Sequence, residues 1–112
     1  MHIASSHMPV LLEPALRRVC EQYVEQVSGI ELVKEILIAL ADRPPIIWTV
    51  ISATPFKDAL RKPIYQVQLA ILRSLDENAE IDFRIVNTSE IRGGEKALGL
   101  MLAESLVIWQ RR

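Results

Sequence analysis

The chain has 112 residues, of which 50% are hydrophobic and only 5% aromatic, and its formal net charge is -1. This length fits one domain with an aliphatic core, and the near-zero charge argues against a generic nucleic-acid binder, which presents a basic surface. Cys20 is the single cysteine, which excludes an intramolecular disulfide and cysteine-rich zinc sites. No apolar run approaches the ~20 residues of a membrane span, so we expect a cytoplasmic protein.

Residues 1–8, with the sequence MHIASSHM, have the character of an expression tag or cloning remnant. We therefore expect one domain over residues 9–112. The excluded segment holds both histidines, His2 and His7, so the rest of the chain offers no histidine for acid–base or metal chemistry. We expect neither a metal nor a cofactor.

Two amphipathic segments open the domain. Apolar residues recur at helical spacing from Pro14 to Val27, with proline in the first turn, which predicts a surface helix. Residues 30–41 also place apolar residues three and four apart and carry few charges, which predicts a second helix buried on most sides. Ser28 and Glu31 fit a capping box at its start.

Residues 46–52, with the sequence IIWTVIS, are apolar on both faces and rich in β-branched side chains. Pro44-Pro45 precedes this stretch and Thr54-Pro55 follows it. Such a run is typical of a strand buried on both sides, and we expect it to be the central strand of a small sheet.

The remaining chain alternates helices and strands. We expect a helix over 63–75, a half-exposed strand over 81–87, a helix over 95–103 and a last strand over 105–110, with Arg111 in solvent. The order α-α-β-α-β-α-β predicts an α/β fold with a three-stranded, mainly parallel sheet. A narrow sheet leaves two open edges that need cover, so the sequence favours a homodimer.

Two acidic residues and a glycine pair are candidates for chemistry. Glu80 and Asp82 are two residues apart in the expected strand, so their carboxylates point to the same face. They could hold a divalent cation or serve as acid and base. A solvated strand face, with Arg84 as counter-charge, is the simpler interpretation. Arg92, Gly93 and the glycine after it precede a helix and could cradle an anion, but the full phosphate-loop pattern is absent, which favours a plain turn.

The loop after the central strand offers a hydroxyl, a base and an acid, from Thr54, Lys57 and Asp58. Ligands of open α/β sheets bind at this edge, although the set matches no catalytic motif and ordinary loop chemistry also explains it. We expect no catalytic residues. The candidate ligand-binding residues are Thr54, Lys57, Asp58, Glu80, Asp82, Arg92 and Gly93.

From Ile46 onward the layout resembles the latter part of minimal nucleotidyltransferase domains of the antitoxin type. An apolar strand is followed by a loop and a helix, then by a strand that opens with Ile81-Asp82, and the chain ends in an apolar strand that contains Trp109. Only Asp82 matches a family carboxylate. The family's Gly-Ser loop and Asp-x-Asp pair are missing, so the resemblance implies a degenerate member that lacks the machinery for a triphosphate and its metals.

The sequence therefore predicts a small domain that acts through protein–protein contact, as a homodimer. The alternative is a degenerate nucleotidyltransferase-like domain that binds a small ligand or nucleotide without catalysis. Nucleic acid is the less favoured partner, because the positive charges are scattered.

Overall fold

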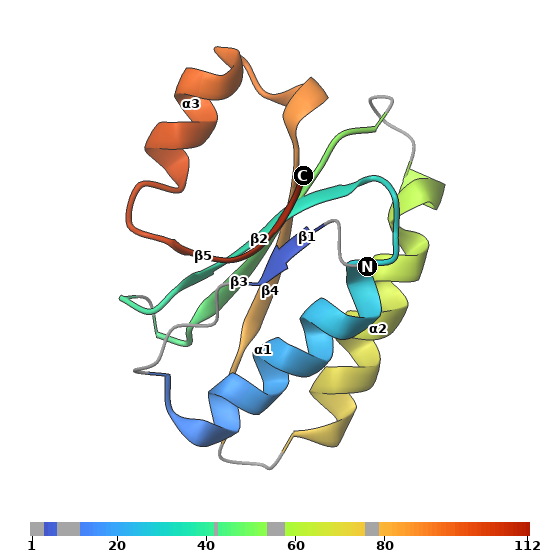
Figure 1. Cartoon of the computed structure of the whole chain (residues 1–112), viewed down its shortest axis with the longest axis vertical. Coiled ribbons are helices and arrows are strands. Elements are labelled where there is room, and N and C mark those ends of the chain that lie inside the picture. The colour runs from blue at the N-terminus through green and yellow to red at the C-terminus, as the bar shows by residue number, and fades with distance from the viewer. Residues whose placement is uncertain (1–3, 7–11, 42, 54–57, 76–78) are drawn as a thin grey trace.

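Five strands form one mixed sheet, with two helices on one face and a third on the other (Figure 1). The computed structural model describes residues 4–6, 12–41, 43–53, 58–75 and 79–112. The strands are β1 (Ala4–Ser6), β2 (Val33–Ala39), β3 (Ile46–Ile51), β4 (Asp82–Asn87) and β5 (Leu106–Arg111). The helices are α1 (Pro14–Val27), α2 (Lys62–Ser74) and α3 (Gly94–Met101), with short 3-10 turns η1 (Asp58–Arg61) and η2 (Thr88–Glu90).

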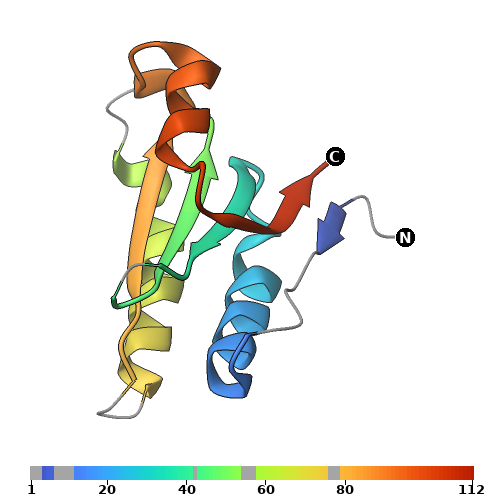
Figure 2. The ribbon, with the colours of Figure 1, turned by 90° about the vertical axis from the view of Figure 1, so that its left-hand side faces the viewer.

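The strand order is β1-β5-β2-β3-β4, and only β3 and β4 run parallel. Helices α1 and α2 cover one face of this sheet, with α2 nearer β4 (Figure 2). The larger core lies there and includes Tyr23, Ile36, Ile47 and Ile64. The opposite face carries a smaller core of Leu37, Val50, Val86 and Leu102, next to α3.

Several sequence predictions are confirmed. The helices expected at 14–27, 63–75 and 95–103 are present as α1, α2 and α3, with ends that differ by one or two residues. The apolar stretch at 46–52 is strand β3, as expected, and five of its six residues are buried. It lies between β2 and β4, however, and the central strand of the five is β2. The half-exposed strand at 81–87 is β4, which lies at the end of the strand order.

The helix expected over residues 30–41 is wrong, because this segment forms β2. The run from Ile36 to Ala39 is buried on both faces of the sheet, so all of its residues are apolar and no alternation reveals a strand. A short apolar run of this kind cannot be told from a buried helix by periodicity alone. Ser28 consequently ends α1 and caps no second helix.

The three-stranded, mainly parallel sheet is also wrong, although the α/β class is correct. The new strand β2 forms an antiparallel hairpin with β3, and β5 returns antiparallel on its other side. Only the connection from β3 through α2 to β4 is a parallel crossover. Ala4–Ser6, within the segment expected to be a tag, pairs antiparallel with β5 as the outermost strand β1.

Arg111 ties the last strand to the end of α1 and is not free in solvent as expected. Its Nε donates to the carbonyl of Val33 at 2.8 Å, and its Nη2 donates to the carbonyls of Ser28 and Ile30 at 2.8 and 3.0 Å. The guanidinium also lies 5.0 Å from the centre of the Trp109 ring. One side chain thus satisfies three carbonyls where α1 turns into β2.

Candidate functional site

The carboxyl ends of β3 and β4 meet at one edge of the sheet, because these strands are parallel. Asn87 ends β4, and its side chain pairs with the backbone of Ala53, which follows β3. Its Oδ1 also accepts from the Ser89 N–H at 3.2 Å, which fixes the start of η2. The amide side chain thus extends the strand pairing by one step after the ladder ends.

An ion pair continues this network towards α2. Arg61 Nη2 lies 3.1 and 3.0 Å from the two carboxylate oxygens of Glu90, and Asn87 Nδ2 donates to the same carboxylate at 3.3 Å. The side chains of Arg61 and Glu90 are 17% and 26% exposed. The network connects η1, η2 and the residue that follows β3, so it stabilises the carboxyl edge.

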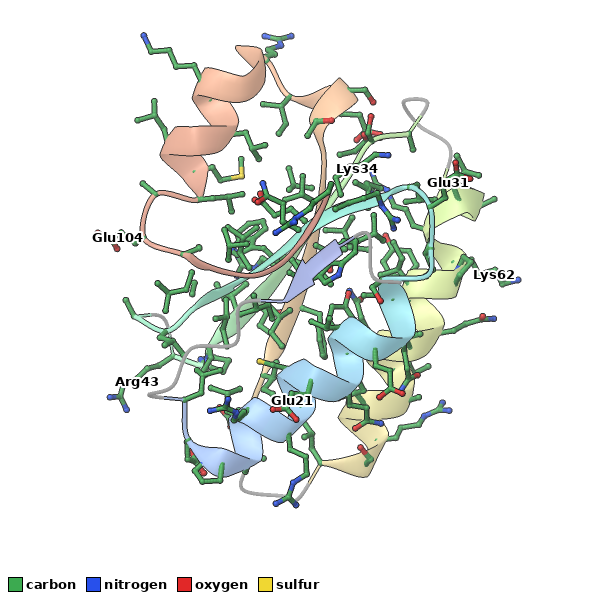
Figure 3. All side chains as sticks on the ribbon, in the orientation of Figure 1. Glu21, Glu31, Lys34, Arg43, Lys62 and Glu104 are labelled. Carbon is green, nitrogen blue, oxygen red and sulfur yellow. The ribbon has the colours of Figure 1, made fainter. Side chains whose placement is uncertain are left out.

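A crevice of about 470 Å³ lies at the same edge, on the face that α3 covers. Its lining comes from β2, β3, β5, η2 and the start of α3: Lys34, Glu35, Val50, Thr88, Gly94, Leu98, Gln110 and Arg111. Arg111 belongs to the lining, but its guanidinium is not free to bind a ligand, because it donates to three carbonyls. Lys34 Nζ lies 3.4 Å from the carbonyl of Glu31, so its charge stays near the rim (Figure 3).

Glu35 is a partly buried acidic residue in the lining of this crevice. In the sheet it pairs with Val50 of β3 on one side and with Gln110 of β5 on the other. Burial raises the pKa of its carboxyl above the usual range. Among the residues that the structure describes, none forms an ion pair with it. A half-buried carboxylate without a counter-charge, in a crevice, is a candidate binding group.

The sequence-predicted site residues fall into two separate places. Arg92 and Gly93 lie at the carboxyl edge, just before α3. Gly93 has a φ of +88°, a left-handed conformation that favours glycine. It is the N-cap residue of α3 and offers no side-chain cap. Asp58 begins η1 near this edge. Thr54 and Lys57 lie outside the described residues.

Glu80 and Asp82 lie at the other end of β4. A strand rises about 3.3 Å per residue, so this end is roughly 16 Å from the carboxyl edge, and the two groups cannot share a site there. Asp82 accepts from Arg84 Nε at 2.9 Å on an exposed face, as the simpler interpretation of this pair held. Glu80 lines a separate groove of about 980 Å³ with Arg43, which projects at the far end of the sheet from Lys34 (Figure 3).

Metal and thiol chemistry find little support in the described part of the chain. No group of three or more His, Cys, Asp or Glu residues within it is arranged to hold a metal ion. Cys20 is fully buried, and burial raises the pKa of its thiol to about 12, so the reactive thiolate does not form near neutral pH. None of the described helices combines the length and apolar character needed to cross a bilayer.

Sequence reasoning missed one surface, which we call the side surface: the outer edge of β4 together with Tyr65, Leu69 and Leu72 of α2. These three apolar residues follow the i, i+4, i+7 spacing, so they form one stripe along the helix. They are 46%, 48% and 42% exposed, whereas Ile64 and Ile71 on the inner face are buried. The helical spacing was visible in the sequence, but which face would stay uncovered was not.

The stripe lies on the β4 side of α2. Tyr65 stands one turn after Arg61, whose side chain reaches Glu90 just beyond β4. Within the described residues β4 pairs with β3 alone, so its other edge carries unpaired backbone groups. An exposed apolar stripe and an open strand edge therefore adjoin each other.

No protein-family model matches the chain, and comparisons with curated proteins and with solved structures also give no match.

Proposed function

We propose that this chain is a small cytoplasmic interaction domain that works through protein–protein contact and forms a homodimer. The observation that supports it is the side surface, where the apolar stripe of α2 adjoins the open edge of β4. Neither the apolar stripe nor the strand edge carries a catalytic group, and either one alone would not indicate a function. Together they have the two properties of an interface, apolar area and unpaired hydrogen-bonding groups.

The energetics favour covering this surface. An open strand edge is a template for pairing with another chain, and natural proteins protect such edges with bulges, charges or covering elements. Full burial of a leucine side chain stabilises by roughly 1.5–3 kcal/mol, and Leu69 and Leu72 keep nearly half of that area in water. A second copy would cover the edge and the stripe at the same time.

The test is the oligomeric state of the chain with and without residues 1–8. Because β1 lies at the opposite end of the sheet from β4, we expect a dimer at micromolar concentration in both forms. Leu69→Glu should give a monomer, since it places a charge in the stripe. Gln66→Glu adds the same charge to an exposed position on another face of α2 and should leave the dimer intact. A monomer in both forms at micromolar concentration would refute the proposal.

The second candidate function is the binding of a small ligand or nucleotide, without catalysis, as in a degenerate nucleotidyltransferase-like domain. Glu35 favours it, as a half-buried carboxyl that lines the crevice beside α3. A thermal-shift screen with nucleotides, with and without magnesium, tests this function. A binder should raise the melting temperature of the parent protein but not of Glu35→Gln, with Glu31→Gln as the exposed control. If no compound moves the melting temperature, this candidate fails.

A further inference from the structure

We infer that the partner at the side surface is a second copy of this chain, paired antiparallel through β4, with Phe83 opposite the partner's Phe83. This inference depends on the proposed homodimer and specifies its register. In this arrangement the two sheets join into one continuous sheet across a two-fold axis.

The backbone of β4 determines which groups are available for pairing. The Asp82 N–H donates to the carbonyl of Pro45 at 2.9 Å, so the peptide groups of Asp82 point towards β3. Along a strand these groups alternate in direction, so those of Phe83 and Ile85 point away from the sheet. An antiparallel partner strand would form hydrogen-bonded pairs with these two residues.

Charge selects the register among those that the backbone allows. With Phe83 on the two-fold axis, Asp82 lies opposite the partner's Arg84, and Arg84 lies opposite the partner's Asp82. A two-residue shift in one direction places Asp82 opposite the partner's Asp82, although it also places Glu80 opposite the partner's Arg84. A two-residue shift in the other direction places Arg84 opposite the partner's Arg84. Opposite charges across a strand pair stabilise it, and like charges destabilise it. Of the three registers, the inferred one alone pairs opposite charges and opposes no like charges.

The apolar residues agree with the same register. On the face covered by α1 and α2, Phe83 and Ile85 are only partly buried and pack at the margin of the larger core. The inferred register places Phe83 against the partner's Phe83, and Ile81 against the partner's Ile85. Because the two-fold axis keeps α2 and the partner's α2 on one face of the joined sheet, their apolar stripes meet over this seam.

Charge reversal in the full chain tests the register. Asp82→Arg and Arg84→Asp each place like charges opposite each other twice, so each should weaken dimerisation roughly tenfold. The double variant Asp82→Arg/Arg84→Asp restores both pairs and should return the dissociation constant to within about threefold of the parent. The internal Asp82–Arg84 pair is exposed, so its loss should leave folding nearly unchanged, which circular dichroism checks.

Disulfide trapping gives a second readout if a charge variant fails to fold. In a Cys20→Ala background, Asp82→Cys and Arg84→Cys chains are mixed and gently oxidised. Residues directly opposite in a non-hydrogen-bonded pair have Cα atoms about 4.5 Å apart, which a disulfide can bridge. We expect the mixed disulfide, and little self-linkage of either chain alone.

The outcomes separate the two proposals. Efficient self-linkage of Arg84→Cys or of Asp82→Cys would overturn the inferred register in favour of a shifted one. A dimer that is insensitive to charge reversal and forms no mixed disulfide would overturn the β4 pairing while leaving self-association intact. A parent chain that stays monomeric would overturn the proposed function itself.

Discussion

The side chain of Asn87 pairs with the backbone of Ala53 as if it were another strand residue. Its Oδ1 accepts from the Ala53 N–H and its Nδ2 donates to the Ala53 carbonyl, both at 3.1 Å. Asn87 is 3% exposed, so neither half of this pair can be replaced by water without rearrangement. The carboxyl edge of the parallel strands depends on this amide.

Replacement of Asn87 by aspartate should destabilise the protein by roughly 1–3 kcal/mol. Aspartate keeps the acceptor but removes the donor to Ala53, and it brings a second negative charge beside Glu90. Urea denaturation measures the loss. Ser52→Ala changes an exposed residue just after β3 and should cost less, so equal losses would contradict the role assigned to Asn87.

A buried polar contact joins α1, β3 and α2. The Tyr23 hydroxyl lies 2.5 Å from Thr49 Oγ1 and accepts from Gln68 Nε2 at 3.0 Å. Tyr23→Phe should lower the free energy of unfolding by about 1–3 kcal/mol, because it leaves the other two groups buried without their partner. Gln22→Ala, at an exposed position of α1, is the control and should change stability little. If both variants are equally stable, the contact does not contribute.

Arg111 and Arg112 form a matched pair for a test of the α1 connection. Arg111→Lys should cost about 1.5–3 kcal/mol, because a lysine cannot reach three carbonyls with a planar fork. Arg112→Lys changes an exposed residue and should be neutral. Thermal or urea unfolding of both variants decides this. Equal stability of the two variants would show that the carbonyl contacts matter little.

Cys20 should react with a thiol reagent only when the protein opens. Burial raises its pKa to about 12 in the folded protein, whereas an unfolded chain releases the proton near pH ~8.5. The contribution of Cys20 to stability is therefore complete below that lower value and declines as the pH rises towards 12. Cys20→Ala should remove this part of the alkaline decline. Rapid labelling of the native protein at pH 8 would contradict the burial.

The sequence was informative where burial and periodicity agree. Residues 46–52 are apolar on both faces, and the stretch between Pro44-Pro45 and Thr54-Pro55 is too short for a buried helix, so β3 could be predicted. Residues 30–41 are similarly apolar but lack such boundaries. Because β2 is buried on both faces, its apolar residues match helical spacing by coincidence. The hairpin, and with it most of the sheet topology, could not be predicted after that error.

The candidate site was predictable only in part. The loop after β3 could be placed at the carboxyl edge from the sequence, because strand polarity follows from the crossover through α2. Glu80 and Asp82 were candidates because they lie two apart on one strand face, but the structure places them at the far end of β4 from the carboxyl edge. Glu35 was missed, since it was expected on the surface of a helix and lies instead in a strand beside the crevice.

The most direct test of self-association is sedimentation of the chain over a concentration series that spans the micromolar range. We expect a species of twice the 12.7 kDa chain mass that Leu69→Glu converts to the single-chain mass, while Gln66→Glu does not. A single-chain mass for the parent protein at every concentration, with or without residues 1–8, would contradict it.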